Sequence, residues 1–308
     1  MTKSLEKEWF IEAPWGRICI VAWGNCHDPP VLLCHGSADC AATFGPLIRL
    51  LPTNFYYIAM ETPGNGRSDP FPPGLMIHLY DMVYALKRVV DHFRWDQFVY
   101  MAHSSGTAVG MIYNLCCPGK MSKIIQLDPT PLAYSVRHDE FAQWYKRFFS
   151  KHYENYKKNN KARDQSDDVD VDRALDKIKN NRGVTEDVAK TILERMSVPV
   201  GNGLVRFSFD VRTKNLTPTP FSSDYLTKNF ASIETPILTF VAKNSEALGF
   251  FDNAPFICDE TLYPAKNYRI FRVPGTHDVH LSHPERVASE ISLFLLHGLK
   301  GLDSKSKL

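Results

Sequence analysis

The sequence predicts an α/β protein whose mostly parallel sheet is covered by helices on both faces. Two observations support this fold class. Short apolar runs, typical of buried strands, alternate with segments of helical periodicity along most of the 308 residues. Between residues 134 and 233 this alternation stops and helical patterns dominate. We therefore expect one core made of residues 1–133 and 234–308, with residues 134–233 inserted as a helical cap, or lid.

The expected elements of the core follow in a regular order. Residues 9–23 alternate partly around a Pro-Trp-Gly turn, which is typical of a β-hairpin. Further buried strands are expected at residues 31–34, 55–60, 97–102, 123–127, 236–242 and 268–273. Helices are expected at residues 41–51, 78–93, 108–115 and 285–296. Within the cap, only residues 204–211 have a strong strand pattern.

The most informative stretch is Ala102-His103-Ser104-Ser105-Gly106, between an expected strand and an expected helix. It has the small-x-Ser-x-small form of a nucleophile elbow, in which a strained turn exposes the serine oxygen. Small residues are needed two before and two after the serine because strand and helix lie close together. Ser105 would place His103 and Thr107 at those positions, so Ser104 is the preferred nucleophile.

A serine nucleophile needs donors for the oxyanion that develops in the reaction. The backbone N–H of Ser105 follows the nucleophile and is one expected donor. The strand at residues 31–34 runs into His35-Gly36-Ser37, where the glycine lets the loop approach the nucleophile. The N–H of Ser37 is therefore the second expected oxyanion donor.

A serine hydroxyl also needs a histidine base, and that base needs a carboxylate to orient it. His277 follows small turn residues after the last expected strand, so we prefer it to His280, which we expect to pack. Glu246, just beyond the strand at residues 236–242, is the first choice for the acid. Asp128, which ends the strand after the elbow helix, and Asp252 remain alternatives.

Other classes of site have little support. The 36 basic and 34 acidic residues give a net charge of +2, so no global field indicates nucleic acid or a membrane surface. No apolar run is long enough to span a bilayer. The glycine-rich turn at residues 61–68 lacks the spacing of a P-loop or dinucleotide site, so no cofactor is expected. His277, His280 and His283 have no cysteine nearby, so we expect no metal site.

The residues Ser306-Lys307-Leu308 match the carboxy-terminal address that the peroxisomal import receptor reads. The start of the chain is too charged for a secretory signal, and the seven scattered cysteines indicate thiols rather than a disulfide framework. We expect a peroxisomal protein that uses this receptor as a partner, or otherwise a cytoplasmic one.

These motifs together resemble an α/β-hydrolase, and within that fold the serine hydrolase-like (kraken-like) proteins. The segments that carry the resemblance are His35-Gly36 and residues 63–68, 102–106, 127–131, 203–212, 273–281 and 287–289. The resemblance implies an eight-stranded sheet, a helical cap and a hydrolase with a Ser-His-acid triad. A serine at position 104 speaks against the dehalogenase and epoxide hydrolase chemistries of sister groups, which need a carboxylate nucleophile.

The leading functional hypothesis is hydrolysis of an ester or thioester with an apolar acyl group or lipid-like structure, through an acyl-enzyme on Ser104. One alternative is a non-catalytic ligand-binding protein on a hydrolase scaffold, because fold does not imply function. Another is a non-hydrolytic, lyase-type reaction that uses Ser104 and His277 as an acid–base pair.

Overall fold

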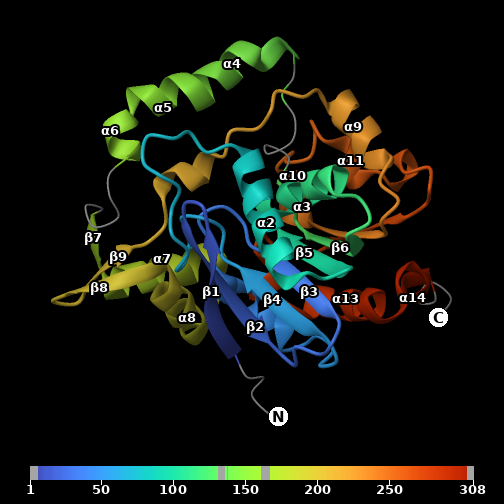
Figure 1. Ribbon diagram of the computed structural model, residues 1–308, viewed down its shortest axis with the longest axis horizontal. Coiled ribbons are helices and arrows are strands. Elements are labelled where there is room, and N and C mark those ends of the chain that lie inside the picture. Colours follow the sequence, from blue (N-terminus) through green and yellow to red (C-terminus); the bar gives the residue numbers. More distant parts are fainter. Residues whose placement is uncertain (1–5, 131–135, 137, 161–166, 304–308) are drawn as a thin grey trace.

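The computed structural model describes residues 6–130, 136, 138–160 and 167–303, and its centre is one eight-stranded sheet (Figure 1). The strands lie in the order β1-β2-β4-β3-β5-β6-β10-β11. Their bounds are β1 (Glu6–Ala13), β2 (Gly16–Trp23), β3 (Pro30–Cys34), β4 (Tyr56–Met60), β5 (Phe98–His103), β6 (Met121–Leu127), β10 (Ile237–Ala242) and β11 (Tyr268–Val273). The strands β1, β2 and β4 pair antiparallel, and the remaining neighbours pair parallel. The mostly parallel sheet predicted from the sequence is confirmed.

Helices cover both faces of this sheet, because strand residues on both sides are apolar and buried. One hydrophobic cluster contains side chains of α2 (Leu79–Phe93), α3 (Ser105–Cys116) and α9 (Ser223–Ala231). The other contains side chains of α1 (Gly45–Ile48), α13 (Glu285–His297) and α14 (Leu299–Asp303). The core thus has two apolar layers, one on each side of the sheet.

The helix expected at residues 41–51 is divided in the structure. A 3₁₀ turn, Ala41–Phe44, is followed by α1, which has proline in its first turn. Proline has no backbone N–H, so Pro46 favours the start of a helix over its interior. The prediction of one continuous helix was wrong here.

The insertion is largely helical, but it also contains a small antiparallel sheet in the order β7-β9-β8. Its strands are β7 (Asp168–Asp170), β8 (Ser197–Gly201) and β9 (Leu204–Phe207). The sequence pattern identified only the region of β9, because β7 and most of β8 lie at the surface and have no apolar alternation. The helices before α9 are α4 (Phe141–Tyr145), a π-helical turn (Lys146–Ser150), α5 (Lys151–Glu154), α6 (Tyr156–Asn159), α7 (Val171–Arg182) and α8 (Glu186–Met196).

Two arginines of the insertion form ion pairs with the core. Arg195, near the end of α8, lies 2.6 Å from Glu61 and 2.8 Å from Glu8. Arg182, at the end of α7, lies 3.1 Å from Asp39. Since Glu61 and Asp39 are buried, loss of either arginine would leave a buried carboxylate without its counterion. These pairs hold α7 and α8 against the loops that follow β3 and β4.

Candidate active site

Ser104 lies at a sharp turn between β5 and α3. Its φ of 54° and ψ of −126° place it in a region that non-glycine residues rarely adopt. A Cβ at Gly106 would lie 2.5 Å from the Cys34 carbonyl oxygen, and one at Gly36 would lie 2.9 Å from the Ser104 Cβ. Two glycines therefore allow the loop after β3 and the start of α3 to approach the serine. This is the geometry that the elbow motif predicts.

His277 contacts the serine oxygen directly. It lies in the loop between β11 and the short helix α12 (Val279–Ser282), and its Nε2 is 2.9 Å from Ser104 Oγ. Its Nδ1 is 2.6 Å from Asp128 Oδ2. With a proton on Nδ1, the imidazole donates to Asp128 and leaves Nε2 to accept from the serine hydroxyl. The preference for Ser104 and His277 therefore agrees with their geometry.

Asp128 is fully buried at the end of β6, and its φ of 43° turns it out of the strand direction. Besides His277, its carboxylate accepts hydrogen bonds from the Ala242 N–H at 2.7 Å and from Ser245 Oγ at 2.6 Å. The donors on both sides fix the orientation of the carboxylate. Ser245 is a residue that the sequence analysis did not identify.

Glu246, the first choice for the acid, does not face His277, so that prediction was wrong for the geometry. It belongs to the short helix α10 (Lys243–Ala247), which turns its side chain outward to accept a 2.8 Å hydrogen bond from Arg272 Nε on β11. Asp252 is exposed in the turn after α10, and no hydrogen bond joins it to His277. Of the three candidate acids, only Asp128 contacts His277.

The surroundings of His277 favour its protonated form. Burial of the ring opposes a positive charge, but the hydrogen bond to Asp128 and the charge of Asp128 outweigh this effect. The pKa of His277 is consequently raised above its ordinary value of 6.5. A more basic imidazole accepts a proton from a serine hydroxyl more readily.

The two residues expected to supply the oxyanion donors contact each other through their side chains. Ser37 Oγ donates a 3.0 Å hydrogen bond to Ser105 Oγ, which joins the loop after β3 to the first residue of α3. The N–H groups at the start of a helix have no partner within that helix, so the Ser105 N–H lies at the positive end of α3. The structure thus brings Ser37, Ser105 and Ser104 together.

His35 and Thr130 also shape this region, although the sequence analysis did not assign them a role. The Nε2 of His35 accepts from the Thr62 N–H at 3.0 Å, so its Nδ1 donates to the Gly36 carbonyl at 2.7 Å and holds the loop beside Ser104. Thr130 Oγ1 lies 2.7 Å from Ser104 Oγ. The position of Thr130 soon after Asp128 was its only signal in the sequence.

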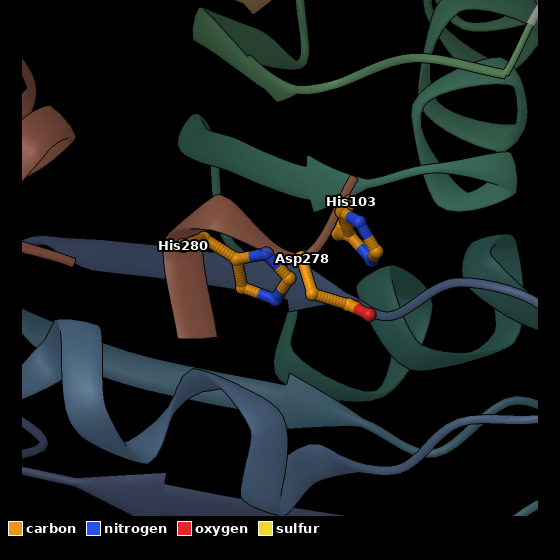
Figure 2. Close-up of side chains that lie close together, drawn as sticks. All are labelled: His103, Asp278 and His280. Carbon is orange, nitrogen blue, oxygen red and sulfur yellow. The ribbon is translucent and has the colours of Figure 1, made fainter. Parts of the chain in front are cut away.

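Next to His277, the side chains of His103, Asp278 and His280 lie close together (Figure 2). One ligand atom from each is within 4.8 Å of the others, close enough for the three to share a metal ion. However, the guanidinium of Arg182 lies 3.9 Å from Asp278 and already supplies a positive charge there. His103 donates to the His277 carbonyl at 3.0 Å and packs at a tilt against His280 with 4.1 Å between ring centroids. Burial lowers the pKa of both rings well below the ordinary value, which favours their neutral forms.

Comparison with known proteins agrees with this geometry. Residues 29–238 match the family model described as the alpha/beta hydrolase fold. The chain belongs to the α/β-hydrolase family. It is 31% identical over 310 aligned residues to human serine hydrolase-like protein 2, with 95% of each chain covered. It is 30% identical to mouse serine hydrolase-like protein, covering 98% of this chain and 99% of the relative. A hypothetical protein from Pseudomonas aeruginosa PAO1 has the same fold, with a TM-score of 0.77, 20% identity, and 95% of this chain and 100% of that chain covered.

The contacts of this α/β-hydrolase predict which carboxylate controls the rate at which Ser104 is labelled. We expect Asp128→Asn to slow covalent labelling of Ser104 by a fluorophosphonate by about 10⁴-fold, because the amide no longer holds the required imidazole tautomer. Glu246→Gln and Asp252→Asn should stay within about twofold of the unchanged protein, since surface charges contribute little. Labelling rates are read by intact mass, and thermal melting checks that each variant is folded. A larger loss in Glu246→Gln than in Asp128→Asn would contradict the assignment.

Proposed function

We propose that this protein is a serine hydrolase that cleaves an ester or thioester through an acyl-enzyme on Ser104. The observation that carries the proposal is the continuous hydrogen-bond chain from Ser104 Oγ to His277, at 2.9 Å, and from His277 to Asp128, at 2.6 Å. A serine on a strained turn, a histidine with a raised pKa and a buried carboxylate form the arrangement that activates a hydroxyl for acyl transfer.

The proposed reaction has two halves. Ser104 Oγ attacks the acyl carbon while its proton moves to His277 Nε2, and the N–H groups of Ser37 and Ser105 stabilise the oxyanion. The bond to the leaving alcohol or thiol then breaks, and that group takes the proton from His277. In the second half, water gives a proton to His277 and attacks the acyl carbon. Collapse of this intermediate releases the acid, and the proton returns from His277 to Ser104 Oγ.

We further propose an apolar acyl group. The ring of Phe250 lies 6.4 Å from the His277 ring, centroid to centroid, so an aromatic side chain borders the reacting atoms. An apolar acyl chain would remove such surface from water, at about 25 cal/mol for each Å² buried.

The deciding experiment is covalent labelling with a fluorophosphonate, followed by intact mass and peptide mapping. We expect a single adduct on Ser104, absent in Ser104→Ala and slowed at least about 10³-fold in His277→Ala, because the general base is lost. Turnover of p-nitrophenyl esters and the matching thioesters should follow the same pattern. A folded protein that gives no adduct where a control hydrolase reacts would favour the ligand-binding alternative.

The raised pKa of His277 predicts a pH dependence. The base must be neutral to accept a proton, so protonation of His277 abolishes the reaction as the pH falls. Because the pKa of His277 lies above 6.5, the labelling rate should fall to half its plateau at a pH above 6.5. Rates measured between pH 5 and 9 test this expectation, with Glu246→Gln as a control whose profile should not change. A half-maximum below 6.5 would be incompatible with the Asp128–His277 pair as described.

We also propose import into peroxisomes through Ser306-Lys307-Leu308, which lie outside the described residues. The motif alone supports this step. Fluorescence microscopy of an amino-terminally tagged protein should show peroxisomal puncta, and deletion of the three residues should make the signal cytosolic. Puncta that persist after the deletion would contradict the proposal.

A further inference from the structure

The insertion contains a cavity of about 710 Å³ that belongs to none of the contacts described for Ser104. Its lining residues come from helices α4, α5 and α6 and the π-helical turn, and from residues 76–77, 211–212 and 217. In Figure 1 these helices form an arch at the edge of the molecule, apart from the central sheet. The volume lies in the range of sites that bind small molecules.

The cavity is positively charged. Lys146, Arg147 and Lys151 line it, and none of its lining residues is acidic. No ion pair to any of these three side chains is found in the described part of the chain. Arg212 also lines the cavity, but Asp210 at 2.6 Å and backbone carbonyls compensate its charge. Three cations therefore line the cavity with no partner carboxylate among the described residues.

The backbone explains why the two lysines lie together. The segment Lys146–Ser150 is a π-helical turn, closed by a hydrogen bond from the Lys151 N–H to the Lys146 carbonyl. In an α-helix, residues five apart point about 140° away from each other. The wider π turn brings the directions of Lys146 and Lys151 closer together, and both side chains line the cavity. Single π turns inside helices occur frequently at functional sites.

The remaining walls are mixed. Four apolar side chains contribute to the lining, and three amides provide hydrogen-bonding groups. The apolar residues are Met76, Ile77, Phe148 and Val211, and the amides are Gln143, Asn155 and Asn159. A ligand that satisfies this lining has an anionic end and an apolar segment.

We propose that this cavity binds an amphiphilic organic phosphate, with the phosphate on Lys146, Arg147 and Lys151 and the apolar segment on Ile77 and Phe148. A phosphate monoester carries up to two negative charges and several acceptor oxygens, which suits three convergent cations. The proposal does not depend on the catalytic role of Ser104. The ligand is either part of a substrate that extends to Ser104 or a separate molecule with the same chemistry.

The test uses octyl phosphate as the probe, with the full-length Ser104→Ala protein in a calorimetric titration. We expect saturable binding that weakens as the salt concentration rises, because exposed charges are screened. Octanol and inorganic phosphate should each bind at least about tenfold more weakly, since each lacks one half of the ligand. Absence of binding by octyl phosphate would overturn the proposal.

A matched pair of double variants separates the cavity from general charge. Lys146→Gln with Lys151→Gln should weaken octyl phosphate binding at least about tenfold, since each lost cation removes a charge-assisted hydrogen bond. Lys157→Gln with Lys158→Gln removes the same charge from α6, whose lysines do not line the cavity, and should change binding less than about twofold. Equal losses in the two variants would overturn the proposal.

Fluorophosphonate labelling of the protein with Ser104 intact distinguishes a phosphate-bearing substrate from a separate phosphate ligand. Competitive inhibition of fluorophosphonate labelling by octyl phosphate would place its site on the path of a phosphate-bearing substrate. Binding that leaves the labelling rate unchanged would assign the cavity to a separate ligand. If Ser104 forms no adduct at all, the proposed hydrolase function fails, while the calorimetric result for the cavity still stands.

Discussion

The close approach of two backbone segments beside Ser104 is the constraint on which the rest of the site depends. Gly106, the second residue of α3, lies directly against the carbonyls of Cys34 and His35, and Gly36 leaves room for the Ser104 side chain. Any larger residue at Gly106 would push α3 away from β3. The positive φ of Ser104 is maintained because the buried strand β5 and α3 hold it from both sides.

A second constraint joins three neighbouring strand ends. Asp128 ends β6, Ala242 ends β10, and His277 follows β11, so the carboxylate is held by the same part of the sheet that delivers the imidazole. A buried carboxylate is costly unless its oxygens are hydrogen-bonded, and here three donors satisfy it. The hydrogen bonds to Asp128 thus account for its burial. The hydrogen bond between Asp128 and His277, together with the charge of Asp128, accounts for the raised pKa of His277.

The core and the insertion differ in their electrostatics. Near Ser104, Asp278 is paired with Arg182, and burial lowers the pKa of His103 and His280. In the insertion, Arg182 and Arg195 are used to hold α7 and α8 to buried carboxylates of the core. Among the described residues, Lys146, Arg147 and Lys151 form no ion pair, so these cations do not hold the insertion to the core.

The sequence by itself determined the fold class and the sharp turn at Ser104. Apolar runs of strand length alternating with helical patterns require a covered parallel sheet, and the small residues around Ser104 require a tight turn. His277 could be predicted because it lies in the turn after the last strand, whereas His280 is buried against Phe44 and His103. All of these are properties of short segments, so a local pattern is enough to reveal them.

Only the tertiary structure decided which carboxylate contacts His277. Asp128 and Glu246 both lie at or just beyond the ends of strands that pair with each other, and spacing along the chain does not distinguish them. The difference arises because Asp128 has a positive φ that turns it inward, while α10 turns Glu246 toward Arg272. The small sheet of the insertion and the cavity beside the π-helical turn were equally hidden, because both depend on segments that meet only after folding.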